Sequence, residues 1–406
     1  MKTVYRVLSA LLALCILSVC LNLHAANQNV TVVLDGEKLV FDGAQPYYDS
    51  TVARVYVPVR GLTEAMDATV EYDDATKTVT ISRAGTTLKL RIGVVTATVN
   101  GVAIALDAPP FISDGATYIP LRFVSENLLL DVSWDSAASV VTLTSRVQLE
   151  LGMSSDDAKA AFGEPSRTAV SEKGYTWWVY DDLDNYKMIG VSEGLVVAYY
   201  LHAQTWQLGD GLRSGMTAAD CDAQLSKLKS QDFGTYTVYT GDTTSYTLFY
   251  DENGSAYAVL RELNEYSSKT RISIAVLDGY AKQFLDLVNI ERRRLELAVI
   301  VWDDSIADIS QTHSADMAKN NTYSHTGTDN STPYDRLSAA GFKDFYHIEI
   351  IARAFPNALT AFSAHLGNAQ YRAVLRAGYS SMGAGVAYNP QSDGILYYTQ
   401  VFHTSK

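Results

Sequence analysis

The residues whose types could support chemistry lie in the last third of the chain. His325 stands in a polar run, Glu349 stands in an apolar run, and His313 precedes both. A histidine paired with a carboxylate can act as a general base with an orienting partner. Histidine and carboxylate groups are also common ligands of zinc. The residue types therefore offer either an acid–base pair or part of a metal site.

A helix and a loop must position these side chains. One apolar stripe follows helical spacing and includes Ile306, Ile309, His313 and Met317. His313 on such a stripe is either a hydrogen-bonded core residue or a catalyst. Residues 324–329 are polar and predict an exposed loop that presents His325. Thr332 before Pro333 predicts the start of the next helix, since proline suits the first helical position.

The surrounding elements predict a small sheet flanked by helices. A helical stripe between residues 280 and 295 ends near the basic run 292–294, which we expect to be a solvated helix face. Residues 354–366 predict another helix. Ser381–Tyr388 and Gly394–Phe402 alternate in hydrophobicity and predict two strands.

Three motifs resemble the bacterial secreted branch of the CAP superfamily, which comprises the cysteine-rich secretory, antigen-five and pathogenesis-related proteins. The family carries a cleft tetrad of two histidines and two acids, which holds a divalent metal in some members. The matching runs are Ser324-His325-Thr326, then Ile348-Glu349-Ile350-Ile351-Ala352 in place of Gly-Glu-Asn-Ile-Ala, and Asn368-Ala369-Gln370-Tyr371-Arg372 in place of Ser-Pro-Gly-His-Arg. The resemblance implies a CAP domain with an α-β-α sandwich over residues 279–406.

By this resemblance His325 and Glu349 are retained members of the tetrad, and Tyr371 replaces the second histidine. No Asp or Glu occurs between residues 350 and 392, so the second acid is missing. A catalytic zinc site takes about three protein ligands. We therefore expect a degenerate cleft, lined also by His313, that holds no tight metal and no cofactor. Tyr371, which is expected to line the cleft, can still hydrogen-bond Glu349 but binds zinc poorly at neutral pH.

Two functions follow from this pattern. The first is a non-catalytic binding protein. The alternative is a hydrolase or metal-dependent enzyme that acts on cell-wall polymer or peptide, with His325 and Glu349 as its catalytic residues. His313, His347 or His365 would complete a metal site only if the fold brought one of them to this pair.

Residues 31–145 contain an internal repeat. The run Tyr56-Val57-Pro58-Val59-Arg60 returns as Tyr118-Ile119-Pro120-Leu121-Arg122. Each copy predicts β-hairpins around a short, proline-initiated helix over Val59–Met66 or Leu121–Leu129, and the two copies are expected to pack together. The pattern resembles the stalk domain named after the N-terminal region of copper amine oxidase. This stretch has no His or Cys, so we expect a spacer or a wall-binding surface and no copper.

Residues 148–275 resemble the CAP-associated module that precedes bacterial CAP domains. The pattern predicts a helix ending near Phe162, several strands, and a weaker second copy that begins near Arg213. Its many aromatic residues are either strand core or a sugar-stacking face. Cys221 is expected to pack in the interior rather than to react.

Length and composition indicate the class of protein and its location. The 406 residues suit a multidomain α+β protein, and the net charge of −13 disfavours nucleic acid as a partner. Residues 1–26 predict a signal peptide, and no disulfide is possible in the mature chain because only Cys221 remains. We expect a secreted, extracellular or wall-associated protein whose partner is a cell-wall polymer or a surface protein. Membrane attachment would require an uncleaved or lipidated leader.

Overall fold

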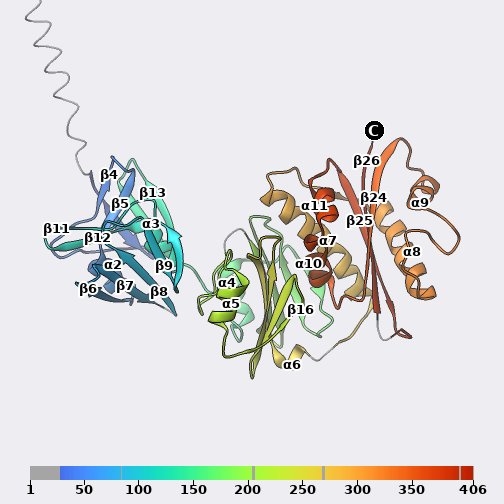
Figure 1. Ribbon diagram of the computed structural model, residues 1–406, viewed down its shortest axis with the longest axis horizontal. Helices are drawn as coiled ribbons and strands as arrows, with labels where there is room; N and C mark the ends of the chain where they lie inside the picture. Colours follow the sequence, from blue (N-terminus) through green and yellow to red (C-terminus); the bar gives the residue numbers. More distant parts are fainter. Residues whose placement is uncertain (1–27, 84, 204–205, 268–269, 393–394, 406) are drawn as a thin grey trace, which may run out of the picture. The chain divides into compact units, whose positions relative to one another are not determined.

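The computed structural model describes residues 28–83, 85–203, 206–267, 270–392 and 395–405. The predicted signal peptide lies outside these residues. The chain folds into two compact units (Figure 1). Unit 1 comprises residues up to 148 with 209–211, and unit 2 comprises 149–208 and 212–406. Each unit is described by itself.

Unit 1 contains the two sequence repeats packed around one core. The short helices α2 (Val59–Ala65) and α3 (Leu121–Asn127) each begin directly after a proline, as the sequence predicts. The strands preceding them, β5 (Arg54–Pro58) and β12 (Ala116–Pro120), pair with each other in antiparallel fashion. Apolar side chains of both copies, such as Leu62 and Val124, share a single hydrophobic cluster. Neither copy therefore encloses a core alone.

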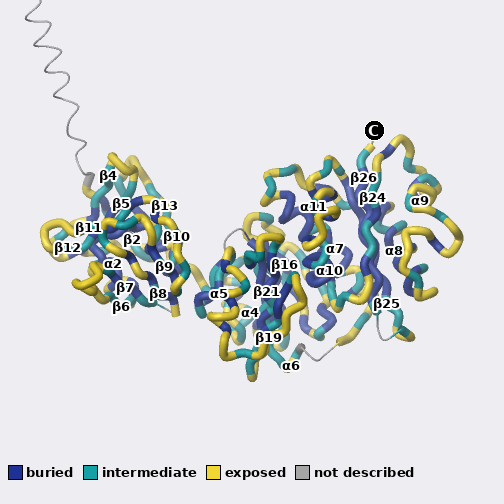
Figure 2. Tube along the Cα trace, in the orientation of Figure 1, coloured by how far each residue is buried: buried dark blue, intermediate teal, exposed yellow. Residues whose placement is uncertain are grey.

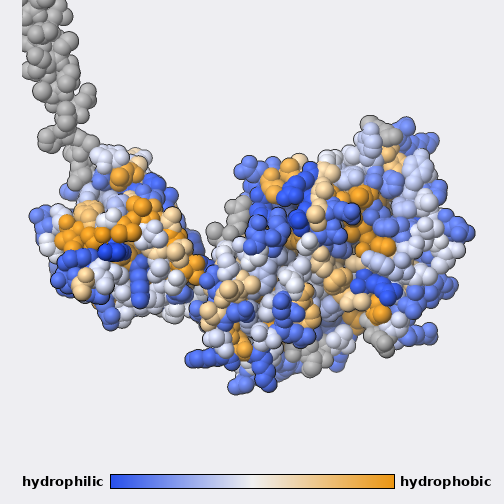
Figure 3. Space-filling view, in the orientation of Figure 1, coloured by the Kyte–Doolittle hydropathy of each residue, from blue (hydrophilic) through white to orange (hydrophobic). Residues whose placement is uncertain are grey.

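The sheets of unit 1 also mix the two copies. β14 of the second copy pairs in parallel with β2 of the first. Figure 3 shows apolar residues gathered over part of the visible face of this unit. The remaining strands are β1 (Gln28–Asn29), β2 (Thr31–Leu34), β3 (Glu37–Lys38), β4 (Tyr47–Asp49), β6 (Thr69–Asp73), β7 (Thr78–Arg83), β8 (Thr86–Arg91), β9 (Thr96–Val99), β10 (Val102–Ala105), β11 (Phe111–Ser113), β13 (Leu130–Asp135) and β14 (Val140–Ser145).

The first part of unit 2 is an eight-stranded antiparallel sheet in the order β15-β16-β17-β18-β22-β21-β20-β19. One face packs with α4 (Ser155–Phe162) and α5 (Ala218–Gln224), where Cys221 is fully buried. The other face shares a hydrophobic cluster with the rest of unit 2. The bounds are β15 (Arg167–Val170), β16 (Thr176–Tyr180), β17 (Asn185–Ser192), β18 (Leu195–Ala203), β19 (Lys229–Asp232), β20 (Tyr236–Thr240), β21 (Thr244–Tyr250) and β22 (Ala256–Leu263), followed by α6 (Asn264–Ser267).

The second part of unit 2 is a four-stranded sheet in the order β23-β25-β26-β24, with helices on both faces (Figure 1). Buried strands lie at the centre of this part (Figure 2). The strands are β23 (Val301–Trp302), β24 (Phe345–Arg353), β25 (Ser381–Asn389) and β26 (Ile395–Ser405), and the helices are α7 (Ile274–Arg294), α8 (Asp304–Asn320), α9 (Pro333–Ala339), α10 (Ala358–Gly367) and α11 (Ala369–Arg376).

Two local predictions are wrong. The helix expected at 354–366 begins at Ala358, because Asn357 caps it by accepting a hydrogen bond from the Thr360 amide. The basic run is not a wholly solvated face, since Arg292 is buried and donates to the carbonyl oxygens of Leu375 and Ala377. Those bonds join the end of α7 to the end of α11 and to the residue that follows it. Among the described residues, no helix is long and apolar enough to cross a membrane.

Candidate polar site around Glu349

The face of the sheet on which a residue lies decides whether it can reach the site. Side chains alternate along β26, so Val401 packs with Ile306 of α8 while Phe402 packs into the cluster on the opposite face. Glu349 of β24 is directly opposite Val401 in the antiparallel register. Its carboxylate therefore points toward α8 and α9.

α8 lies unusually close to this face of the sheet. A Cβ atom added to Gly385 of β25 would lie 2.1 Å from the backbone nitrogen of Gln311, and one added to Gly383 would lie 2.1 Å from that of Ala307. Glycine at both positions therefore permits the close approach. Ser314 of α8 donates a hydrogen bond to the Gly385 carbonyl oxygen at 2.9 Å. This packing fixes the helix that carries His313.

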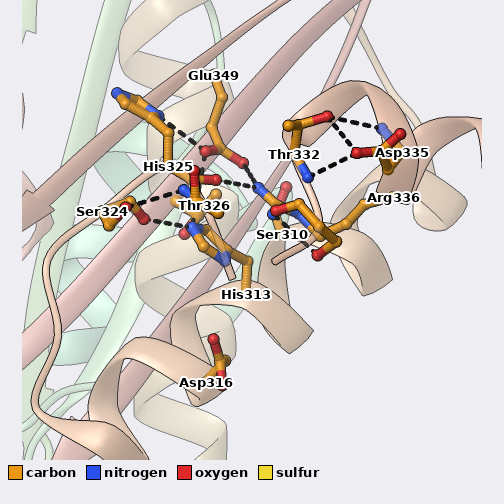
Figure 4. Close-up of polar contacts among 12 residues, drawn as sticks. Ser310, His313, Asp316, Ser324, His325, Thr326, Thr332, Asp335, Arg336 and Glu349 are labelled. Atoms are coloured by element: carbon orange, nitrogen blue, oxygen red, sulfur yellow. Dashed lines mark hydrogen bonds and ion pairs between the residues drawn. The ribbon is translucent and has the colours of Figure 1, made fainter. Parts of the chain in front are cut away.

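The Glu349 carboxylate is buried and surrounded by nitrogen groups (Figure 4). His325 Nδ1 lies 2.9 Å from Oε1 and donates a hydrogen bond to it. His313 Nε2 lies 3.7 Å from the same oxygen. Arg336 Nη2 donates to Oε2 at 2.6 Å. Both carboxylate oxygens are thus in contact with protein groups, and Arg336 contributes a full positive charge.

Arg336 also fixes the loop that carries His325. Its Nη1 donates to the Ser331 carbonyl oxygen at 3.0 Å, and its Nη2 donates to the His325 carbonyl oxygen at 3.2 Å. Its side chain is only 11% exposed. The α9 helix that holds it begins with a capping box between Thr332 and Asp335. One guanidinium therefore joins the loop, the helix and strand β24.

His313 is a hydrogen-bonded interior histidine that also faces the carboxylate. Its Nε2 donates to the Ser324 carbonyl oxygen at 2.9 Å. Burial lowers the pKa of His313, and the nearby negative charge of Glu349 only partly offsets this effect. The imidazole therefore stays neutral over a wider pH range than a free histidine. The structure thus shows the hydrogen-bonded core histidine that the sequence left open as one alternative, and it places this residue beside Glu349.

A second contact between α8 and the loop involves Asp316. Thr328 donates to Asp316 through both its hydroxyl, at 2.6 Å, and its backbone amide, at 2.9 Å. Burial alone would raise the pKa of Asp316, but these hydrogen bonds outweigh it and the pKa is lowered. The exposed loop is thus held at one end by His313 and in its middle by Asp316.

Tyr371 does not line this site, contrary to the sequence expectation. It lies on α11, which covers the other face of the sheet, and its hydroxyl donates to Gln400 Oε1 at 2.9 Å instead of to Glu349. Gln400 also contacts His365 Nδ1 at 3.1 Å. Because Gln400 and Val401 point to opposite faces of β26, Tyr371 and His365 are separated from Glu349 by the sheet.

Comparison with known proteins identifies the regions in chain order. Residues 33–143 match the family model of the copper amine oxidase N-terminal domain, and residues 151–230 match the CAP-associated N-terminal model. Residues 285–402 match the model of the cysteine-rich secretory protein family. The C-terminal third is a CAP domain.

Three known proteins are similar to part of this chain. An uncharacterized membrane protein, YlbC, of Bacillus subtilis is 26% identical over 290 residues, which cover 62% of this chain and 82% of that protein. The crystal structure of an extracellular protein containing an SCP domain from Bacillus anthracis has 24% identity and a TM-score of 0.56, and covers 68% of this chain and 98% of that one. A cysteine-rich secretory protein from Staphylococcus aureus has 14% identity and a TM-score of 0.49, over 62% of this chain and 91% of that one.

The residues of this CAP domain do not fit a divalent metal of the kind that some family members hold. The resemblance makes His325 and Glu349 the retained members of the tetrad, and within the described ranges no group of three or more His, Cys, Asp or Glu side chains is arranged to hold an ion. Arg336 already donates to Oε2 of Glu349. An approaching cation would have to displace this guanidinium.

Sequence reasoning placed His325 beside Glu349 but missed Arg336. Its motif position, three residues after Pro333, gives no sign of burial by itself. The signal that could have found it is the apolar run around Glu349. A carboxylate buried in such a run requires a positively charged or hydrogen-bonding partner. His347 lies two residues from Glu349 on the same strand face, where it packs against Tyr334 and Phe345.

Proposed function

We propose that this chain is an exported bacterial CAP-domain protein that acts by binding outside the cell, and that its Glu349 cluster is structural. The observation that carries the proposal is the pairing of Glu349 with Arg336 inside the protein. A carboxylate with both oxygens engaged by protein donors is a poor metal ligand and a poor base. The extracellular protein of B. anthracis with the same fold supports the location.

Unit 1 supplies a surface suited to binding. A groove of about 830 Å³ is lined by apolar and polar side chains, among them Val40, Tyr72 and Arg60. Val40 is 82% exposed and Tyr72 is 42% exposed. Exposed apolar groups gathered in one hollow mark interaction sites more often than isolated ones do. We propose that the partner is a cell-wall polymer, whose sugar rings would pack on Tyr72 and whose polar groups would meet Arg60.

Co-sedimentation of the full chain with isolated bacterial wall tests this role. Val40→Asp and Tyr72→Ser should each reduce the bound fraction several-fold. Val147→Asp is the matched control, because Val147 is 55% exposed in the same unit and does not line the groove. Wall binding that all three variants retain, or no wall binding by the native chain, would contradict the proposal. Loss of binding after protease treatment of the wall would identify a surface protein as partner instead.

A second candidate function rests on the exposure of His325. Its side chain is 54% exposed while Nδ1 is bound to the buried Glu349, so a neutral imidazole presents its free Nε2 lone pair to solvent. That group could accept a proton from water during hydrolysis of wall polymer or peptide. Release of soluble wall fragments by the native chain, abolished in His325→Ala, would establish this activity. Equal release by both proteins would exclude it.

A further inference from the structure

A cavity of about 250 Å³ lies elsewhere in unit 2. Its walls come from the eight-stranded sheet, from α7 and from the start of α10. These two helices cover the face of the CAP sheet opposite Glu349, so the cavity is separate from the polar site. Nothing in the proposed wall-binding function depends on it.

The polar groups that line this cavity include two buried carboxyl groups. Glu172 and Glu262 both line it and are only 7% and 6% exposed. Tyr175 donates to Glu262 Oε1 at 2.8 Å. Burial raises the pKa of Glu262, and the hydrogen bond from Tyr175 and the charge of Lys173, which also lines the cavity, oppose that rise. Two buried carboxyl groups against one lysine leave a site that favours an additional cation.

Gln283 of α7 adds an acceptor that the protein leaves unused. The residue lines the cavity and is 4% exposed. Its Nε2 contacts Met188 Sδ at 3.5 Å, and within the described part of the chain its Oε1 is buried with no hydrogen-bond partner. A buried polar atom without a partner is rare in a folded protein, so it calls for a missing donor.

Aromatic rings complete the wall. Trp177, Tyr236 and Phe249 line the cavity, and Phe233, which is 47% exposed, lies at its rim. Phe233 stacks on Tyr236 with a centroid separation of 4.7 Å. The faces of aromatic rings attract cations and also pack against aliphatic chains. An anionic ligand would meet both carboxyl groups, so the lining selects against it.

From this lining we propose that the cavity binds an ammonium group carried on an aliphatic stem. The ammonium would donate to Gln283 Oε1 and to the carboxylates of Glu172 and Glu262, and the stem would pack on the aromatic wall. The volume is slightly below the range of about 300–1,000 Å³ for typical ligand pockets, which suits a single amine or one lysine side chain. A free amine and a lysine within a peptide share this chemistry.

Calorimetric titration of the full chain with two probes tests the site. The probes are pentylammonium and Nα-acetyl-lysine amide, and 1-pentanol is the uncharged control. We expect saturable binding of at least one probe, with pentanol about tenfold or more weaker because it lacks the charge-assisted hydrogen bonds. The preferred probe shows whether the natural source is a free amine or a polypeptide. No saturable binding of either probe, or equal binding of pentanol, would overturn the proposal.

Variants assign the binding to this cavity. Glu262→Gln keeps the acceptor for Tyr175 but removes the charge, and it should weaken the preferred probe by about tenfold or more. Glu172→Gln provides an independent test if the first variant folds poorly. Glu193→Gln is the matched control, because Glu193 is exposed in a turn of the same unit and does not line the cavity. Binding that is unchanged in both cavity variants would refute the assignment.

Discussion

Replacing Arg336 by methionine should destabilise unit 2 strongly. Methionine can occupy the space of the arginine stem but cannot donate a hydrogen bond. The change leaves Glu349 buried without its cation and frees the carbonyl oxygens of His325 and Ser331. Only His325 and His313 then remain beside the carboxylate, and burial keeps the pKa of His313 below its ordinary value. A neutral His313 compensates the lost charge poorly.

The expected size follows from the burial of the pair. Removing one partner of a buried ion pair costs about 3–5 kcal/mol of unfolding free energy. In a unit of this size each kcal/mol lowers Tm by about 2–4 °C, so the loss should be about 6–20 °C. The matched control is Arg293→Met, because Arg293 forms a two-pronged but exposed pair with Asp184. That variant should leave Tm nearly unchanged, since exposed pairs contribute little.

Differential scanning calorimetry of the full chain measures the shift, and a double mutant tests its cause. If the cost comes from the unpaired charge, Arg336→Met combined with Glu349→Gln should lose less than the sum of the single changes, by about 0.5–3 kcal/mol. An Arg336→Met shift no larger than that of Arg293→Met would refute the reasoning. Strict additivity in the double mutant would show that Arg336 acts through packing alone.

Three further outcomes follow from the same packing. Gly385→Ala should cost roughly 3 kcal/mol or more, measured by urea unfolding, because the new Cβ meets the backbone of Gln311 at 2.1 Å; a mild effect would mean that α8 can shift freely. Burial lowers the pKa of His365 to about 4, so between about pH 6.5 and 4 the unfolded chain binds a proton that the folded chain does not. Stability should therefore fall by up to about 3 kcal/mol as the pH drops through that window, and His365→Gln should flatten this part of the urea-unfolding profile. Thr328→Val removes the hydroxyl bond to Asp316 and should speed amide hydrogen exchange in residues 324–331 by roughly tenfold; unchanged exchange would show that the loop is held elsewhere.

Much of the site could be predicted because short sequence patterns determine the elements that carry its residues. The apolar stripe through Ile306 and Met317 correctly placed His313 on the inner face of a helix. The Thr332-Pro333 pair marked the start of α9, where the cap and first-turn proline are found. The motifs that contain His325 and Glu349 brought together two residues that are in direct contact.

The features that could not be predicted depend on which face of a sheet a residue occupies. Tyr371 was assigned by its order among the motifs, but order along the chain does not say on which side of β26 a helix packs. Strand β24 was not predicted, because its buried positions, Phe345, Glu349 and Ala352, do not alternate regularly with exposed ones. The core shared by the eight-stranded sheet and α7 could not be predicted either. It depends on contacts between residues far apart in sequence, such as Tyr186 and Asp286.

The role of Arg336 could be inferred only from the folded geometry. A positive charge was needed near Glu349 once the metal ligands of the family were seen to be missing. The sequence does not tell which of its many basic residues supplies that charge. The answer depends on the loop from His325 to Ser331, whose carbonyl oxygens bind the same guanidinium.

Zinc titration of the full chain tests the central claim most directly, namely that Arg336 occupies the carboxylate that a metal would need. Competition against a chromophoric chelator at neutral pH should show no site-specific uptake at micromolar zinc, and His325→Ala should behave like the native chain. Uptake of one zinc per chain at micromolar concentration or below, lost in His325→Ala, would contradict the account.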